Sequence, residues 1–120
     1  MGRVVALVED IFFIAKMKET AKQTGVALET AGNPPEFGGL AEAARADGTS
    51  LLIVDLNARG SIEAVEKLRA AGITLPVIAF FSHVQAELGE RARAAGCEQV
   101  MPRSQFSRDL AEILSRAKTA

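Results

Sequence analysis

Two apolar runs of this chain end in acidic residues. Residues 3–8 (Arg-Val-Val-Ala-Leu-Val) lead directly into Glu9 and Asp10, and residues 50–54 (Ser-Leu-Leu-Ile-Val) lead into Asp55. Short apolar runs bounded by polar residues are typical of strands that are buried on both faces of a parallel sheet. Ligand sites of open α/β sheets lie beyond the carboxyl ends of the strands. If the two strands are neighbours, the three acidic side chains therefore lie close together.

Three carboxylates in one place favour a bound cation. Two carboxylates about 4 Å apart repel each other by roughly 4 kcal/mol at an effective dielectric near 20. Their hard oxygen atoms favour Mg²⁺ over zinc. The cluster of Glu9, Asp10 and Asp55 therefore predicts a Mg²⁺ site. The alternative is that each acid only caps the helix after its strand, since acids are favoured at helix N-termini.

The composition is that of a single globular domain spanning residues 1–120. The net charge is −1, and the 14 basic residues are interspersed with 15 acidic ones, which predicts no nucleic-acid or membrane partner. The longest apolar run, residues 77–81, is far shorter than the roughly 20 residues of a membrane span. The first residues do not have the pattern of a signal peptide. Cys97 is the only cysteine, so no internal disulfide forms and a cytoplasmic location is expected.

Glycines recur at a near-regular interval along the chain. Gly25, Gly48, Gly72 and Gly96 are 23 or 24 residues apart, which is about the length of one strand plus one helix. Each follows a helix-like segment, where glycine takes the left-handed conformation of a C-cap at little cost. This spacing predicts alternation of strands and helices. The expected strands are Arg3–Val8, Val26–Thr30, Leu51–Asp55, Val77–Phe81 and Gln99–Met101.

Apolar residues at helical spacing predict five helices between and after these strands. The expected inward faces are Ile11, Ile14, Met17 and Ala21; Ile62, Val65 and Leu68; Leu88, Ala92 and Ala95; and Leu110, Ile113, Leu114 and Ala117. The second helix is expected at about Leu40 to Ala46, after a loop over Gly32–Gly39. Of the Phe12-Phe13 pair, one ring is expected to pack inward and the other to be an exposed partner contact. Right-handed crossovers then give a parallel sheet with helices on both faces.

The sequence resembles the receiver domains of bacterial two-component response regulators over nearly its whole length. The segments that carry the resemblance are Leu7-Val8-Glu9-Asp10, Leu52-Ile53-Val54-Asp55-Leu56-Asn57, Leu75-Pro76-Val77-Ile78 and Ala94-Ala95-Gly96-Cys97. It implies a flavodoxin-like three-layer α/β fold with strand order 2-1-3-4-5 and five helices. It also implies that Asp55 is the phosphoacceptor, and that Glu9, Asp10, Asp55 and the carbonyl of Asn57 bind Mg²⁺.

The same resemblance implies a signalling protein rather than an enzyme. A sensor histidine kinase or a phosphotransfer protein would supply the phosphoryl group. A downstream protein would then bind the fourth helix, the fifth strand and the fifth helix. We therefore expect a stand-alone receiver-like domain of a two-component system or phosphorelay.

Two positions depart from the receiver pattern. Phe81 occupies the place of the Thr or Ser that ends the fourth strand and contacts the phosphoryl group, and it has no hydrogen-bond donor in its side chain. Ser82 follows it, but successive strand residues face opposite sides, so we expect only a bulge or a one-residue shift to direct Ser82 at the site. Arg103 replaces the Lys after the fifth strand; it keeps the charge in a larger, planar group. These changes predict that partner binding depends weakly on phosphorylation.

The loop after Asp55 also differs from the receiver pattern, since it reads Asn57-Ala58-Arg59-Gly60-Ser61. Arg59 either reaches back to the acidic cluster and occupies the place of the metal, or lies solvated on the loop. Two further functions stay open. One is a pseudo-receiver, which binds a protein independently of phosphorylation. The other is a flavodoxin-like small-molecule binder or a Mg²⁺-dependent phosphotransfer enzyme, against which the small size argues.

Overall fold

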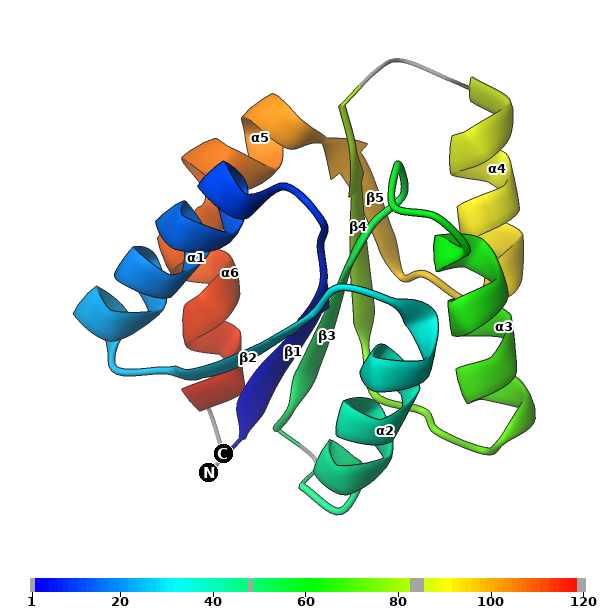
Figure 1. The fold of residues 1–120 in the computed structure, drawn as a ribbon, viewed down its shortest axis with the longest axis horizontal. Coiled ribbons are helices and arrows are strands. Elements are labelled where there is room, and N and C mark those ends of the chain that lie inside the picture. Colours follow the sequence, from blue (N-terminus) through cyan, green and yellow to red (C-terminus); the bar gives the residue numbers. More distant parts are fainter. Residues whose placement is uncertain (1, 48, 83–85, 119–120) are drawn as a thin grey trace.

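Strands and helices alternate along the chain, as the glycine spacing predicts (Figure 1). The computed structural model describes residues 2–47, 49–82 and 86–118, so Gly48 lies outside the described residues. The strands are β1 (Arg3–Leu7), β2 (Ala27–Ala31), β3 (Leu51–Asp55), β4 (Val77–Phe81) and β5 (Gln99–Pro102). The helices are α1 (Ile11–Thr24), α2 (Pro34–Ala44), α3 (Ser61–Ala70), α4 (Ala86–Ala95), α5 (Arg103–Arg108) and α6 (Leu110–Ser115), followed by the 3-10 turn η1 (Arg116–Lys118).

All five strands form one parallel sheet in the order β2-β1-β3-β4-β5, which confirms the expected strand order. The chain continues from β1 to β2 on one side of the sheet and from β3 to β4 and β5 on the other. The connections that follow β1 and β3 therefore lead away from each other. The register pairs Leu7 with Val54, and Asp55 with Phe80. The carboxyl ends of the three central strands therefore lie at the same edge of the sheet.

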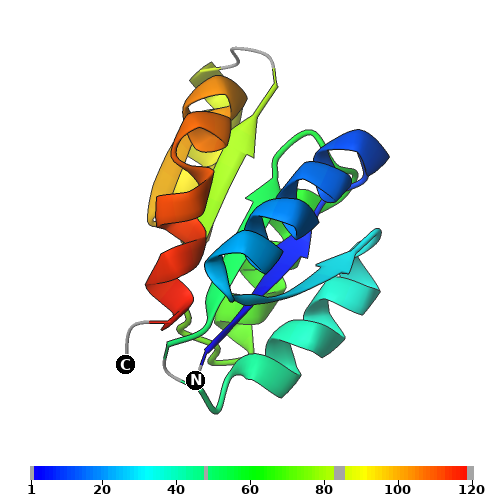
Figure 2. The same ribbon diagram turned by 90° about the vertical axis from the view of Figure 1, so that its left-hand side faces the viewer.

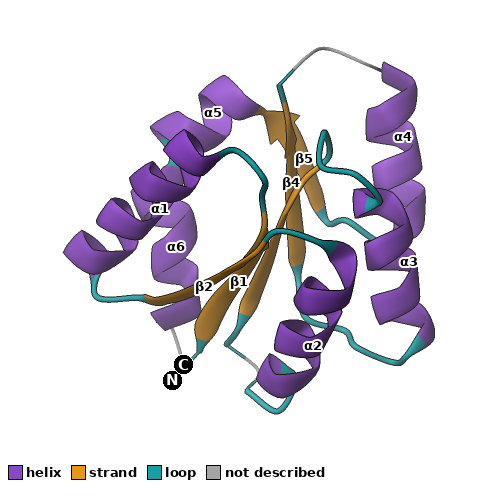
Figure 3. Cartoon of the chain, viewed as in Figure 1, coloured by secondary structure: helices purple, strands orange, loops and turns teal. Residues whose placement is uncertain are grey.

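Helices cover both faces of the sheet, which makes three layers (Figures 2 and 3). Helices α1, α5 and α6 lie on one face, and α2, α3 and α4 lie on the other (Figure 1). Successive residues of the central strands pack into opposite cores: Val4 and Ala6 pack toward α1, whereas Val5 and Leu7 pack toward α2. This double burial explains why the central strands are continuous apolar runs.

Helix α2 begins at Pro34, so the prediction of a loop over Gly32–Gly39 is wrong from Pro34 onward. Asn33 caps the helix, because its side chain accepts a hydrogen bond from the amide of Glu36 at 2.9 Å, and two prolines occupy the first turn. The Glu36 side chain accepts in return from the amide of Gly32 at 2.9 Å. Phe37 is fully buried. The cap and this apolar anchor outweigh the low helix propensity of Gly38-Gly39.

Two other details of the helices differ from expectation. The inward face of α1 is Phe13, Met17 and Ala21, and Ile14 packs partly against the same core. Ile11 is 71% exposed, because it lies two residues before Phe13 and therefore about 200° around the helix from it. Of the Phe12-Phe13 pair, Phe12 is 83% exposed and Phe13 is buried, which confirms that one ring packs inward. The C-terminal segment contains two helices, α5 and α6, in place of one. The described part of the chain contains no helix that is long and apolar enough to span a membrane.

The Asn33 cap yields a testable prediction about stability. Asn33→Ala is expected to lower the free energy of unfolding by about 0.5–2 kcal/mol, because the first turn of α2 loses its side-chain acceptor. Urea denaturation followed by circular dichroism measures this change. Lys18→Ala, on the exposed face of α1, is the control and is expected to change the value by less than about 0.5 kcal/mol. Equal stabilities of the two variants would contradict the role of the cap.

Candidate functional site

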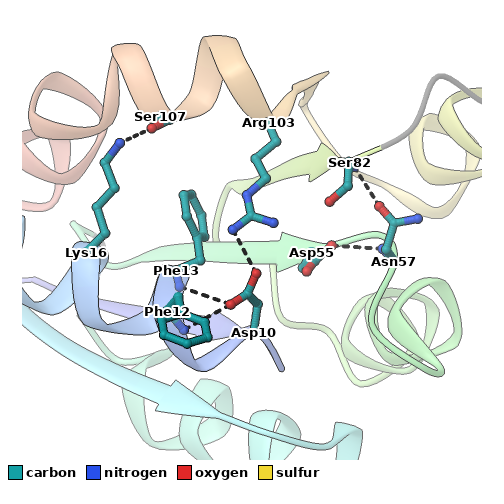
Figure 4. Close-up of polar contacts among 9 residues, drawn as sticks. All are labelled: Asp10, Phe12, Phe13, Lys16, Asp55, Asn57, Ser82, Arg103 and Ser107. Atoms are coloured by element: carbon teal, nitrogen blue, oxygen red, sulfur yellow. Dashed lines mark hydrogen bonds and ion pairs between the residues drawn. The ribbon is translucent and has the colours of Figure 1, made fainter.

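The sheet brings its acidic residues to the edge where β1 and β3 end, as the sequence predicts (Figure 4). Asp10 follows β1 and precedes α1, whereas Asp55 is the last residue of β3. Arg103 reaches the same edge from the first residue of α5. The edge therefore combines carboxylates with a guanidinium group.

Asp10 is the N-cap of α1. Its Oδ1 accepts hydrogen bonds from the amides of Phe12 at 2.9 Å and Phe13 at 3.2 Å. Its Oδ2 accepts from Nη2 of Arg103 at 2.9 Å, which makes an ion pair. These contacts, led by that with Arg103, hold the pKa of Asp10 below its ordinary value. The capping role that we considered as an alternative therefore holds for Asp10.

Asp55 has no such capping role. The N-cap of α3 is Gly60, in the left-handed conformation that glycine favours, with φ 74°. Asp55 is only 6% exposed, and its Oδ1 accepts a hydrogen bond from the amide of Asn57 at 2.9 Å. Burial raises the pKa of Asp55, and the charges of Glu9 and Asp10 also raise it; the Asn57 amide and the Arg103 guanidinium oppose this shift. A buried carboxylate that caps no helix needs another explanation.

The Arg103 guanidinium is held by an aromatic ring as well as by Asp10. Its central carbon lies 4.2 Å from the centroid of the Phe13 ring, which is a cation–π contact. Phe13 belongs to a group of three rings: its centroid is 5.2 Å from that of Phe80 and 5.9 Å from that of Phe106, and the last two stack at 4.5 Å. Lys16 of α1 also donates to the hydroxyl of Ser107 in α5 (Figure 4). The orientation of Arg103 is therefore tied to the α1–α5 side of the core.

Glu9 and Arg59 contact each other through the backbone of Arg59. Oε2 of Glu9 accepts from the amide of Arg59 at 3.1 Å, and the Arg59 side chain is exposed. Of the two positions considered for Arg59, the solvated one is observed, and it is Arg103 that pairs with the acidic cluster. A surface hollow of about 390 Å³ lies beside this contact, lined by Glu9, Gly32, Asn33, Pro34, Arg59 and Gly60.

Phe81 and Ser82 lie on different sides of the end of β4. Phe81 is half-buried and packs against the core beneath α2, α3 and α4, whereas Phe80 packs on the face of α1 and α5. The amide of Ser82 donates to Oδ1 of Asn57 at 2.6 Å, and Figure 4 shows the Ser82 hydroxyl pointing toward the side of Asp55. The pairing of β4 with β3 is regular, so this orientation arises without a bulge and corresponds to a shift of one residue from the position that we counted. Strand alternation itself puts Phe80 and Ser82 on the face of Asp55.

Comparison of the whole chain with solved structures gives one consistent result. The fold superposes on the chemotaxis response regulator CheY4 of Vibrio cholerae with a TM-score of 0.80, at 22% identity and over 98% of each chain. It superposes on a CheY-like receiver domain protein of Methanospirillum hungatei with a TM-score of 0.81, at 18% identity, over 98% of this chain and 94% of the other. It superposes on the receiver domain of a Francisella response regulator with a TM-score of 0.81, at 16% identity and over 98% of each chain.

The chain has the fold of a receiver domain. This confirms the fold that the resemblance implies, with six helices in the described residues instead of five. No family model and no curated protein matches the sequence. At 16–22% identity the likeness concerns the fold, and the roles of individual residues are argued from the site itself.

The receiver-fold site contains donors that suit Mg²⁺. The carboxylates of Glu9, Asp10 and Asp55 and the carbonyl of Asn57 are hard oxygen ligands. In residues 2–47, 49–82 and 86–118, however, no three acidic, His or Cys side chains are gathered in a geometry that could hold a metal ion. The Oδ2 atom of Asp10 is bound to Arg103. The donor chemistry fits Mg²⁺, and the Arg103 contact opposes it.

Sequence reasoning missed Phe13 as a part of this site. Phe13 donates its amide to Asp10 and stacks its ring on Arg103, so it contacts both members of the ion pair. The available signal was its spacing: the third residue after an N-cap acid donates to that acid, and an aromatic ring there lies close to any cation that pairs with it.

The buried carboxylate yields a prediction about pH. Because the pKa of Asp55 is raised in the folded protein, its ionised form destabilises the fold at neutral pH. Asp55→Asn is expected to raise the free energy of unfolding by about 0.5–2 kcal/mol at pH 7. This gain should shrink as the pH falls through the raised pKa of folded Asp55, and it should vanish below about 3.9, where the carboxyl group of the unfolded chain is protonated as well. Urea denaturation at several pH values measures the difference.

The control for this prediction is Glu66→Gln, which removes an exposed carboxylate from α3. It is expected to change the free energy of unfolding by less than about 0.5 kcal/mol at each pH measured. A loss of stability in Asp55→Asn at pH 7 would show that ionised Asp55 is well compensated where it lies.

Proposed function

We propose that the chain is a receiver-type signalling domain of a two-component system or phosphorelay, in which Asp55 accepts a phosphoryl group. The observation that supports this most is the state of Asp55 itself. It is buried at the carboxyl edge of the sheet, it caps no helix, and a backbone amide fixes one of its oxygens. Burial of this carboxylate destabilises the folded protein, which is expected of a group that is retained for chemistry.

The proposed reaction is transfer of a phosphoryl group to a carboxylate. One oxygen of ionised Asp55 attacks phosphorus, an O–P bond forms, and the bond between phosphorus and the donor's leaving atom breaks with its electron pair. With acetyl phosphate as donor, acetate leaves and the protein carries an acyl phosphate. The amide of Asn57 orients Asp55 before attack, because it holds Oδ1 at 2.9 Å.

In this proposal two side chains contact the phosphoryl group. Arg103 supplies a positive charge and can bind phosphate oxygens through two N–H groups. Ser82 supplies a hydroxyl on the side of Asp55 (Figure 4). Mg²⁺ held by Glu9, Asp10, Asp55 and the carbonyl of Asn57 would neutralise charge on the phosphoryl oxygens. In the cell the donor would be a sensor histidine kinase or a phosphotransfer protein, and the output a contact with a downstream protein.

Incubation with acetyl phosphate and Mg²⁺ tests the acceptor. The intact mass is expected to increase by one phosphoryl group in the wild type and to stay unchanged in Asp55→Asn, which removes the attacking oxygen. Glu66→Gln is the control and should be labelled like the wild type. Equal labelling of wild type and Asp55→Asn would place the acceptor elsewhere.

A pseudo-receiver function is the second candidate, and the Arg103–Asp10 ion pair favours it. The internal cation compensates the acidic edge in the absence of a metal. This function predicts no labelling of the wild type by acetyl phosphate under any Mg²⁺ concentration. It also predicts that a captured protein partner binds wild type and Asp55→Asn equally.

The orientation of Ser82 leads to a prediction about the switch. Beryllofluoride, a stable mimic of the phosphoryl group, is expected to bind the wild type more tightly than Ser82→Ala, because a hydrogen bond to a charged group is worth roughly 1.5–3 kcal/mol. Calorimetric titration in Mg²⁺ measures both affinities. Ser104→Ala, at an exposed position in the first turn of α5, is the control. Unchanged affinity in Ser82→Ala would leave the site without a hydroxyl contact, as the assignment of the switch position to Phe81 predicts.

A further inference from the structure

We propose that this chain self-associates head to tail, with the first turn of α1 in one copy docked in a groove between α2 and α3 of another. The inference is independent of the proposed function, because the side chains that form the contact take no part in phosphoryl transfer. It accounts for an exposed apolar pair and an open apolar groove, which the packing of a single copy leaves unexplained.

The apolar pair lies at the start of α1. Ile11 and Phe12 are the large hydrophobic residues that the described part of the chain leaves exposed. Ala15 lies one turn farther along the helix on the same side and is exposed as well, so the outer side of this turn is apolar. Aromatic side chains are enriched in the cores of protein interfaces. The outer side of the first turn of α1 is therefore suited to contact another molecule.

The groove has a volume of about 420 Å³ and lies between α2 and α3. Pro34, Pro35 and Gly38 line it from α2, and Ala64 and Leu68 line it from α3. Cavities of about 300–1,000 Å³ hold small ligands, so the groove has room for an inserted side chain such as that of Phe12. Proline, glycine and alanine lose no side-chain entropy when they are covered. The groove is therefore preformed for an apolar side chain.

Gly38 is not required by the packing within one copy. It lies in the middle of α2, where glycine destabilises a helix relative to alanine. A Cβ atom added at Gly38 would meet no atom within 4 Å beyond its own stretch of helix. A larger residue at this position would project into the groove that Gly38 lines. The loss of helix stability is explained if another copy occupies the space.

The exposed side of α1 carries an excess of positive charge. Lys18 and Lys22 lie on the same side of the helix as Ile11, because they follow it at intervals of seven and eleven residues. Both are exposed, and neither has an ion-pair partner in the described residues. Glu19, also exposed, is the acid between them.

The groove has the opposite excess of charge. Glu63 lines it, and Glu66 is exposed on the same helix; neither forms an ion pair with another described residue. Lys67 is the base beside them. An apolar, basic helix turn and an apolar groove with acids on its rim are complementary in both respects. Such complementarity favours this pairing over contacts between like surfaces.

Helix α1 and the groove lie on opposite faces of the sheet (Figure 1). One copy therefore cannot fill its own groove, and one contact does not bring the reverse contact with it. Repetition of such a head-to-tail contact gives a chain of copies and not a two-fold dimer. Because one helix turn forms the docked surface, the interface is small, and small interfaces give weak, transient association.

Sedimentation equilibrium of the full chain tests the contact. The weight-average mass of the wild type is expected to rise with protein concentration up to about 1 mM, the range of weak association. Phe12→Ser removes the inserted ring, and Gly38→Gln fills the groove. Each is expected to lower the association constant at least about tenfold, since an aromatic anchor dominates the affinity of an interface. Circular dichroism of both variants checks that they are folded.

A mixture of the two variants gives the sharpest test. Gly38→Gln keeps the α1 surface, and Phe12→Ser keeps the groove. One contact can therefore form between unlike variants, and no further copy can be added. The equimolar mixture is expected to approach the mass of a dimer at concentrations where each variant alone is monomeric. A mixture that stays monomeric overturns the proposal.

Two matched controls separate the groove from general effects on the helices. Gly39→Gln introduces the same side chain at the next residue, which has open space around it but does not line the groove. Gln23→Ser changes an exposed residue near the other end of α1. Both are expected to associate like the wild type. If Gly39→Gln weakens association as much as Gly38→Gln, the effect lies in α2 itself and the groove is refuted as the docking site.

Two further outcomes contradict the proposal. A wild type that stays monomeric at about 1 mM shows that the two surfaces do not bind each other. Association that is lost in Phe12→Ser but unchanged in Gly38→Gln shows that α1 docks on a different surface of the second copy.

Discussion

The Asp10 carboxylate joins parts of the molecule that are far apart in the sequence. One oxygen fixes the first turn of α1, and the other fixes Arg103 at the first residue of α5. Phe13 closes this arrangement, because its amide binds the acid and its ring lies under the guanidinium. The same ring then connects the surface to the core through Phe80 and Phe106. The ion pair at the edge of the sheet is thus in direct contact with the apolar packing between the sheet and helices α1 and α5.

The balance of charge at this edge follows from the sheet. Parallel strands buried on both faces end at the same edge, and here two of the central three end in acids. Burial raises the pKa of Asp55, whereas the pairing with Arg103 lowers the pKa of Asp10. Neighbouring carboxylates with opposite shifts are expected to have different roles. In the proposed function Asp10 is one of the groups that would hold the metal, and an oxygen of Asp55 attacks the phosphoryl group.

The strands could be predicted closely from the sequence, because double burial leaves a clear apolar signal: β3 and β4 have the expected ends, and β1, β2 and β5 differ by one residue. The helices were harder to predict where tertiary packing overrides local propensity. Gly38-Gly39 argues against a helix, yet the Asn33 cap and buried Phe37 begin α2 at Pro34. Ile11 matches an apolar face by spacing, yet the helix buries Phe13, Met17 and Ala21 and leaves Ile11 exposed. Both errors depend on capping and on which side chains the core buries, which periodicity alone does not determine.

At the site, the sequence places residues at the edge but not their partners. Strand ends place Glu9, Asp10 and Asp55 at one edge of the sheet, but in the described residues no three acids gather closely enough to hold a metal ion. The pairing of Arg103 with Asp10 depends on the rotamer of a long side chain and on a ring beneath it. Phe81 and Ser82 illustrate the limit most clearly. Counting from Pro76 assigns Phe81 to the switch position, but the register pairs Phe80 with Asp55, so alternation directs Phe81 into the opposite core. Ser82, which follows the strand, is then on the face of Asp55. In a sheet of this kind, the register between neighbouring strands, and not the distance along one strand, decides which residue can contact the ligand.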